Sequence, residues 1–163
     1  MNIVAAEKSK SSTELDPVVE FKKGVELLKN EYPQKAVARL QCAYESDKHN
    51  PYYMSFLGLS IARAQRKWDR ACELCEMALQ LKPKEMQFHL NLGEVYASAG
   101  MREKALDQLD DALKLFGDDP RLKRARSKVS KRRSPLVPFI GREHFLNREL
   151  GKLRHRALKR LGK

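Results

Sequence analysis

One pair of residues in the chain has a spacing typical of metal or redox chemistry, in the sequence Cys72-Glu73-Leu74-Cys75. A structural zinc ion would need two more ligands at a suitable spacing. The histidines show no finger or ribbon arrangement with this pair; they are His49, His89, His144 and His155. We therefore expect Cys72 and Cys75 to be thiols packed in a core, with metal binding or redox use as the alternative.

No other set of residues indicates catalysis. The sequence has no Ser/His/Asp set, no glycine-rich phosphate loop and no metalloprotease motif. The nearby acidic residues Asp107, Asp110 and Asp111 are explained by the solvent-exposed face of a helix. Cys42 brings the cysteines to an odd number, which disfavours a disulfide framework. We expect no enzymatic activity, no cofactor, no bound metal and no small-molecule substrate.

The positive charge is concentrated at one end of the chain. The net charge is +12, yet residues 1–120 hold 17 Lys and Arg against 19 Asp and Glu, whereas residues 121–163 hold 16 against 2. No run approaches the roughly 20 apolar residues needed to cross a bilayer, and the first residues have no apolar stretch typical of a signal peptide. We expect a cytoplasmic protein, with peripheral attachment to a membrane as an alternative, and a basic end that attracts an anionic partner.

A threefold repeat organises most of the chain. Glycines and alanines recur at intervals of 34 or 35 residues, as Gly24, Ala36 and Ala43, as Gly58, Ala71 and Ala78, and as Gly93, Ala105 and Ala112. Asp16-Pro17, Asn50-Pro51 and Asp119-Pro120 are typical helix starts that follow the same interval. The pattern predicts helices at 17–30, 33–47, 51–65, 68–81, 86–99, 102–116 and 120–132. Small residues flanking one larger apolar residue on a helix face allow close packing, and Gly100 suits a tight turn. We expect a looser turn at Gln65-Arg66.

The third copy carries the fullest set of signature residues. Its segment Phe88-His89-Leu90-Asn91-Leu92-Gly93-Glu94-Val95-Tyr96-Ala97-Ser98-Ala99-Gly100, followed by Ala105, Leu109 and Ala112, resembles a tetratricopeptide repeat. The second copy is similar through Leu57-Gly58, Trp68-Asp69, Ala71, Ala78 and Pro83, and the first is weaker because Glu20 and Lys23 replace large apolar residues. The resemblance implies an all-α solenoid of helical hairpins. We assign a disordered leader (1–15), three repeats (17–50, 51–85 and 86–119), a capping helix (120–133) and a tail (134–163).

The resemblance also implies a partner-binding surface. Tetratricopeptide arrays generally hold a partner's peptide against the first helices of their repeats. The matching positions here are Val18, Phe21, Val25, Tyr52, Ser55, Leu59, Arg63, Gln87, Leu90 and Glu94. The alternative is that several of these residues form the core between repeats. Members that clamp the C-terminal carboxylate of heat-shock chaperones use Lys, Arg and Asn, and Phe21, Val25 and Phe56 depart from that set, which favours an apolar or amphipathic ligand.

The tail combines an apolar Pro-containing segment with a basic amphipathic helix. Ser134 to Gly141 includes two prolines and four large apolar residues, and a leucine stripe begins at Leu146. The basic residues of this predicted helix include Arg148, Lys152, Arg156, Lys159 and Arg160. The tail could fold back on the repeats, bind an anionic membrane surface, bind nucleic acid or bind an acidic protein.

Together these features predict a non-enzymatic scaffold or adaptor. Its repeats would hold a protein or peptide partner in a concave groove, and its basic tail would strengthen attachment to an acidic partner or an anionic surface. A nucleic-acid-binding accessory protein and a secretion-type chaperone for apolar segments are the alternatives.

Overall fold

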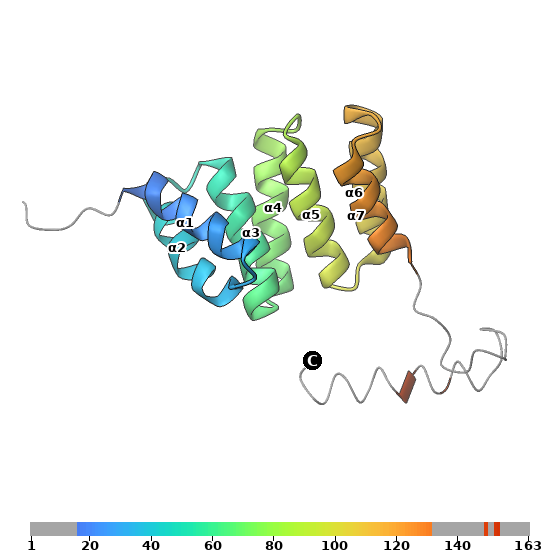
Figure 1. The fold of residues 1–163 in the computed structure, drawn as a ribbon, viewed down its shortest axis with the longest axis horizontal. Coiled ribbons are helices and arrows are strands. Elements are labelled where there is room, and N and C mark those ends of the chain that lie inside the picture. Colours follow the sequence, from blue (N-terminus) through green and yellow to red (C-terminus); the bar gives the residue numbers. More distant parts are fainter. Residues whose placement is uncertain (1–15, 132–148, 150–151, 154–163) are drawn as a thin grey trace, which may run out of the picture. The chain divides into compact units, whose positions relative to one another are not determined.

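The computed structural model describes residues 16–131, 149 and 152–153. The described residues form an all-α fold of seven helices, each with boundaries within two residues of those predicted. The helices are α1 (Pro17–Lys29), α2 (Pro33–Ser46), α3 (Pro51–Gln65), α4 (Trp68–Leu81), α5 (Met86–Ser98), α6 (Arg102–Phe116) and α7 (Pro120–Ser130). Figure 1 shows α1 with α2, α3 with α4 and α5 with α6 as successive helix pairs. No helix in the described part of the chain is long and apolar enough to cross a membrane.

The chain divides into two units, Met1–Val129 and Ser130–Lys163. In the second unit, Lys152 is exposed and helical, and its Nζ lies 2.6 Å from Oε1 of Glu149. The predicted leader 1–15 and most of the predicted tail 134–163 lie outside the described residues. The same holds for four of the predicted basic tail residues, Arg148, Arg156, Lys159 and Arg160.

Polar side chains cap the predicted helix starts. Oδ1 of Asp16 accepts from the backbone N–H of Val18 at 2.9 Å, and Oδ1 of Asn50 accepts from that of Tyr52 at 3.1 Å. Oδ1 of Asp119 accepts from Arg121 N–H at 2.8 Å. Each bond satisfies one of the backbone donors left without a partner in the first turn of a helix. The Asp-Pro and Asn-Pro signals therefore mark true helix starts.

The turns inside the three hairpins each contain a residue with positive φ. These residues are Glu31 (φ 62°), Arg66 (φ 54°) and Gly100 (φ 81°). The expectation of a looser second turn is wrong, because the extra residue of that repeat lengthens its first helix: α3 has 15 residues, whereas α1 and α5 have 13. Only Arg66 and Lys67 separate α3 from α4, so the second turn is the shortest of the three.

The repeated small residues pack the two helices of each hairpin closely together. All six repeated alanines are fully buried: Ala36, Ala43, Ala71, Ala78, Ala105 and Ala112. A Cβ built on Gly24 would lie 2.5 Å from Cγ of Leu40, and one built on Gly93 would lie 3.0 Å from Leu109. A methyl group is therefore not accommodated at Gly24 without movement of Leu40, and the predicted packing role of the small residues is confirmed.

Helix α7 covers the end of the third repeat. Leu122 is fully buried in a cluster with Leu109 and Ala112, and Ala125 and Val129 pack against the same cluster. Arg126 forms an ion pair with Asp110 of α6, and Nε of Arg102 donates to the Val129 carbonyl at 3.1 Å. These contacts hold α7 beside α6 with one helix face turned to the same side as the first helices of the repeats.

Candidate functional site

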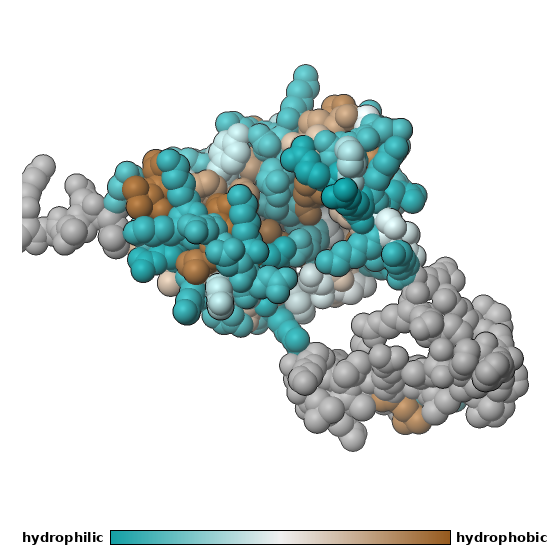
Figure 2. All heavy atoms as spheres, viewed as in Figure 1, coloured by the Kyte–Doolittle hydropathy of each residue, from teal (hydrophilic) through white to brown (hydrophobic). Residues whose placement is uncertain are grey.

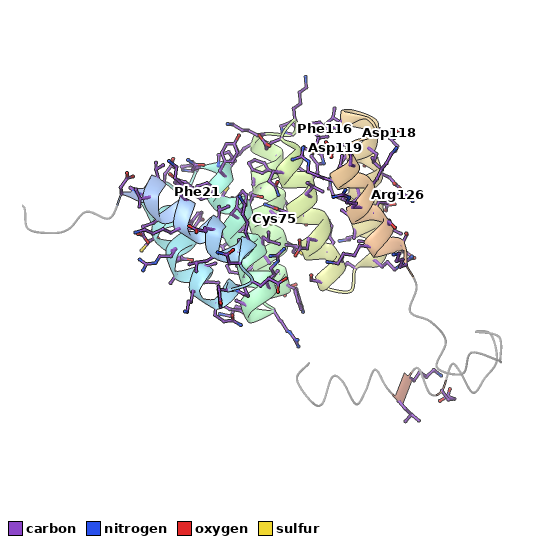
Figure 3. All side chains as sticks on the ribbon, viewed as in Figure 1. Phe21, Cys75, Phe116, Asp118, Asp119 and Arg126 are labelled. Carbon is purple, nitrogen blue, oxygen red and sulfur yellow. The ribbon has the colours of Figure 1, made fainter. Side chains whose placement is uncertain are left out.

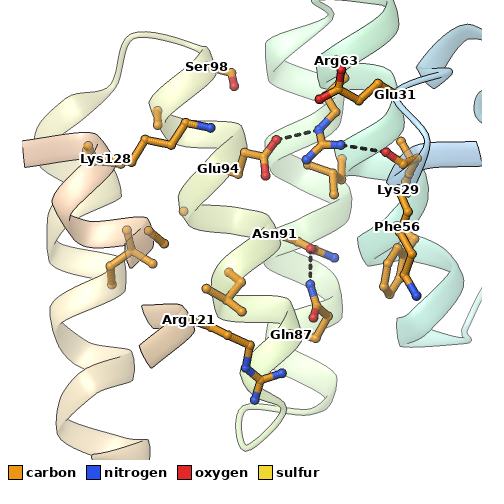
Figure 4. Close-up of a pocket in the computed structure, with 18 of the residues that line it drawn as sticks. Lys29, Glu31, Phe56, Arg63, Gln87, Asn91, Glu94, Ser98, Arg121 and Lys128 are labelled. Carbon is orange, nitrogen blue, oxygen red and sulfur yellow. Dashed lines mark hydrogen bonds and ion pairs between the residues drawn. The ribbon is translucent and has the colours of Figure 1, made fainter. Parts of the chain in front are cut away.

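The first helices of the repeats and α7 together line one groove. Its cavity volume is about 1030 Å³, and α1, α3, α5 and α7 all contribute side chains (Figure 4). The residues that line it include Val25, Lys29, Phe56, Leu59, Arg63, Gln87, Leu90, Asn91, Glu94, Arg102, Arg121 and Lys128. The groove is long enough to touch every repeat, because each repeat and α7 place the same helix face against it.

Arg63 spans the groove from α1 to α5. Its Nε lies 2.6 Å from Oε1 of Glu94, and its Nη1 donates to the Leu28 carbonyl at 3.2 Å. Figure 4 shows this guanidinium between the two flanking helices. Because both partners lie on other repeats, the side chain of Arg63 fixes the relative placement of three first helices at the groove surface.

A chain of polar side chains extends from the groove into the core. Nε2 of Gln87 donates to Oδ1 of Asn91 at 2.8 Å, and Nδ2 of Asn91 donates to Oγ of Ser55 at 2.9 Å. Asn91 and Ser55 are buried, whereas Gln87 is partly exposed. The buried amide is thus satisfied inside the protein, and Gln87 presents the outer end of the chain to the groove.

The groove carries more positive than negative groups. Its lining contains five Lys or Arg residues and two Glu residues. One of these cations, Arg121, also binds Asp119, with Nε 3.2 Å from Oδ1. Hydrogen bonds from the side chain and then the backbone of Arg121 lower the pKa of the Asp119 carboxyl below its ordinary value. This carboxylate therefore stays ionised at the α7 end of the groove.

The structure brings together six of the ten predicted contact residues. Those in the groove lining are Val25, Leu59, Arg63, Gln87, Leu90 and Glu94. The other four predicted contact residues lie outside the groove lining.

Ser55 is fully buried against Asn91, and the Phe21 ring packs on Tyr53 and Phe56 with centroid distances of 5.1 and 5.4 Å. Tyr52 donates its hydroxyl to Oε2 of Glu85 at 2.9 Å, and Val18 is 48% exposed outside the cavity.

Sequence reasoning missed several residues of the groove. Lys29, Phe56, Arg102, Arg121 and Lys128 line the cavity but were not among the predicted contacts. For Arg121 and Lys128 the available signal is the helix start at 120, which follows the same interval as those at 17, 51 and 86 but was not used to extend the predicted groove to this helix. This register gives α7 the position of a first helix, so its cations face the groove as well as covering the end of the stack.

The cysteine pair lies in the core. Cys75 is fully buried (Figure 3), and its Sγ donates to the Ser55 carbonyl at 3.4 Å. Burial raises the pKa of both the Cys72 and the Cys75 thiols. No group of three or more His, Cys, Asp or Glu side chains in the described residues could hold a metal ion. Cys75 takes the packing position that Leu40 and Leu109 hold in the other repeats.

A sequence model described as "Tetratricopeptide repeat" matches residues 62–129. No curated protein sequence matches the chain.

Several solved structures share the fold. The tetratricopeptide domain of Arabidopsis OM64 is 20% identical with a TM-score of 0.59, and the match covers 72% of this chain and 96% of that domain. The first such domain of human RPAP3 is 18% identical with a TM-score of 0.60, covering 70% and 89%. The second domain of human RPAP3, solved in complex with the HSP70 peptide SGPTIEEVD, is 17% identical with a TM-score of 0.58, covering 72% and 100%. The likeness to each of these domains is in the fold.

Proposed function

We propose that the chain is a tetratricopeptide repeat protein, since a model of that family matches residues 62–129 and the solved domains share its fold, and that it is a non-enzymatic scaffold that captures a peptide segment of a partner protein in its groove. One observation carries the proposal. A single cavity of about 1030 Å³ touches the first helix of every repeat and α7, which is the shape that suits an elongated ligand.

The groove offers a peptide two kinds of contact. Partly buried apolar side chains such as Phe56 and Leu90 can bury apolar ligand atoms, which contributes about 25 cal/mol per Å². Gln87 and Arg63 present polar groups that are already held in place, Gln87 by Asn91 on the same helix and Arg63 by the Leu28 carbonyl of the neighbouring repeat. Because these groups are pre-organised, a ligand would order few protein side chains when it binds.

The fold relatives give a precedent for peptide capture, and the groove of this chain differs in chemistry from a carboxylate clamp. The second domain of human RPAP3 was solved with a peptide that ends in Glu-Glu-Val-Asp. In this chain Val25 and Phe56 occupy the groove lining where basic or amide side chains would be expected for a clamp. An apolar or amphipathic segment is therefore our proposed ligand class.

The proposal places the protein in the cytoplasm and gives it no chemical step. The three cysteines, two of them buried, are free thiols, in keeping with a reducing compartment. The basic tail would add a second contact to an acidic partner or an anionic surface, because residues 121–163 hold 16 Lys and Arg against 2 Asp and Glu.

Selection from a random peptide library tests the groove. Peptides selected on the full-length chain would be titrated against the variant Val25→Ser/Leu90→Ser, which makes two groove positions polar. The matched control is Leu81→Ser/Leu115→Ser, which changes two exposed apolar residues outside the groove, 55% and 49% exposed. We expect at least about tenfold weaker binding for the groove variant, corresponding to about 1.4 kcal/mol, and no change for the control. Equal affinities for both variants would refute the proposal.

The tail is tested in the full-length chain by replacing Arg148, Lys152, Arg156, Lys159 and Arg160 with Gln. For an acidic partner we expect weaker binding at low salt and little difference at high salt, because long-range charge attraction is screened by ions. Unchanged affinity at low salt would remove the tail from the proposal while leaving the groove in place.

A further inference from the structure

The groove changes chemistry from one end of the stack to the other. Helices that start at 17, 51, 86 and 120 place equivalent residues at the same position on each first helix. The equivalent residues that line the cavity are apolar on α1 and α3, where they are Val25 and Leu59, and basic on α7, where they are Arg121 and Lys128. Between them, α5 contributes Gln87, Leu90 and Glu94. The apolar and the basic residues of this register therefore lie at opposite ends of the groove.

The α1 and α3 end of the groove holds an apolar patch beside the charged residues Lys29, Glu31 and Arg63. Val25, Phe56 and Leu59 line the cavity there, and Phe56 packs edge-on against the ring of Phe21. Figure 2 shows hydrophobic side chains over α1 and hydrophilic ones over α7 on the same face of the repeat unit. An apolar ligand segment would be drawn to this end because contact there removes apolar surface of both molecules from water.

The α7 end is basic, and its cations divide into two sets. Those on the outer side are paired within the protein, Lys123 with Asp118 at 2.8 Å and Arg126 with Asp110. Arg121 and Lys128 face the cavity, and Figure 4 shows Lys128 extending from α7 toward Glu94 and Ser98. Within residues 16–131, no carboxylate pairs with Lys128 or with exposed Arg124. Of the two cations of α7 that face the cavity, Lys128 therefore has no carboxylate partner, whereas Arg121 is paired with Asp119.

We propose that the occupant of the groove is a protein segment with two unlike ends, an apolar end that lies against α1 and α3 and an acidic end that lies against α7. This inference rests on the proposed peptide-capture function and adds the chemistry and the placement of the ligand. Charge complementarity with Arg121 and Lys128 fixes which end of the ligand meets α7, and the apolar lining by Val25 and Phe56 fixes where the other end lies.

Two other occupants fit these observations less well. The basic tail of the same chain would bring further positive charge to an end that is already positive. An RNA strand would satisfy the cations of α7 but would leave the apolar end of the groove without a matching surface, because a nucleic-acid backbone carries negative charge along its whole length.

The experiment uses the full-length chain and synthetic peptides with one leucine-rich and one glutamate-rich half. The comparison peptides replace the glutamate half with a lysine half, or the leucine half with a serine half. We expect the leucine–glutamate peptide to bind at least about tenfold more tightly than either, with an affinity that falls as salt rises, because both halves contribute and one of them is ionic. Equal binding of the serine–glutamate peptide or of an oligouridine would overturn the proposal in favour of a simple polyanion site.

A charge-reversal variant tests the α7 end. For Arg121→Glu/Lys128→Glu we expect about tenfold weaker binding of the leucine–glutamate peptide and tighter binding of the leucine–lysine peptide. The control Lys67→Glu/Lys84→Glu makes the same change in net charge at exposed positions outside the groove lining, and we expect it to change neither affinity by more than about twofold. Circular dichroism of both variants confirms that the helices are retained.

A spin label tests the placement. Attached to the glutamate end of the peptide, it should broaden the amide NMR signals of α7, and attached to the leucine end it should broaden those of α1. The reverse pattern would overturn the inference, although peptide capture would stand. If the peptide fails to bind while library-selected peptides still depend on Val25 and Leu90, the inference fails alone. If no peptide depends on these residues, both proposals fail.

Discussion

Nε of Arg63 lies 2.6 Å from Oε1 of Glu94, and this ion pair joins α3 to α5 across the middle of the groove. The two side chains are 33% and 38% exposed, so water screens the attraction between them. Such a pair adds little to the stability of a protein, but it can hold two neighbouring surfaces in register. We regard Arg63 as the residue that fixes the shape of the groove.

The first prediction concerns this pair. Arg63→Gln should lower the free energy of unfolding by only about 0.2–1 kcal/mol, because the lost ion pair is partly exposed. Arg63→Gln should weaken the binding of groove peptides more than Glu94→Gln does, since it also removes the hydrogen bond from Arg63 to the Leu28 carbonyl. Urea unfolding and calorimetric titration measure the two effects. Glu94→Gln breaks the ion pair alone and is the matched comparison; equal effects of both variants on binding would show that the bond to Leu28 is unimportant.

The second prediction concerns Gly58. A Cβ at this position would lie 2.6 Å from Sγ of Cys75 and 2.8 Å from the backbone oxygen of Ala71. The backbone oxygen cannot move without shifting α4, so Gly58→Ala should destabilise the fold by about 1–3 kcal/mol despite the better helix propensity of Ala. Gly93→Ala meets only the side chain of Leu109, at 3.0 Å, and should cost less. Urea unfolding checks the order, and a larger loss for Gly93→Ala would contradict it.

The third prediction concerns the stability of the first repeat in acid. Glu20 is buried, and its carboxylate accepts from Nη1 of Arg39 at 2.9 Å and from Nζ of Lys23 at 3.3 Å. The hydrogen bond from Arg39, followed by that from Lys23, outweighs burial and lowers the pKa of Glu20 below its ordinary value. The stabilisation is therefore present above the pKa that Glu20 has in the unfolded chain, and it is lost as the pH falls through the lower pKa of the folded state.

Glu20→Gln should accordingly destabilise the protein at neutral pH and lose less stability than the natural chain on acidification. Thermal unfolding between neutral and acidic pH measures this difference. Glu26→Gln, an exposed position on the same helix, is the control and should follow the natural chain. Parallel curves for the natural chain and Glu20→Gln would mean that the buried carboxylate has no role in the pH dependence.

The fourth prediction concerns thiol reactivity. Cys42 is exposed, whereas Cys72 and Cys75 are buried, and burial raises the pKa of both of these thiols. A thiol-specific reagent should therefore label Cys42 rapidly in the folded protein and reach Cys75 only when the fold opens, because the thiolate is the reactive form. Mass spectrometry of the labelled peptides gives the order. Rapid labelling of Cys75 without unfolding would contradict its place in the core.

The helices and the packing of the hairpins could be predicted from sequence because their signals are local. Gly24, Ala36 and Leu40 lie within one hairpin, and the same set recurs in each repeat. The turn at Arg66 could not be predicted, since nothing in the type of this residue signals its positive φ. The extra residue of the second repeat lies in helix α3 and not in the turn. Its position depends on the packing of the whole hairpin.

The site was only partly predictable because it depends on contacts between repeats. Ser55 was expected at the groove, but Asn91, 36 positions later in the chain, fixes it in the core. Arg121 and Lys128 were assigned to a capping helix, and their second role emerges only once α7 is placed in the register of a first helix. Such contacts depend on how one hairpin is rotated against the next. The sequence pattern of a single repeat does not specify this rotation.

The most direct test of peptide capture is an NMR titration of the isotopically labelled full-length chain with a library-selected peptide. If the groove captures the peptide, shifts of the amide signals concentrate on the groove-lining residues of α1, α3, α5 and α7, including Val25, Leu59, Leu90 and Lys128. Signals of the outer helices α2 and α4 should move little. Shifts confined to α2 and α4, with the groove residues unchanged, would contradict peptide capture in the groove.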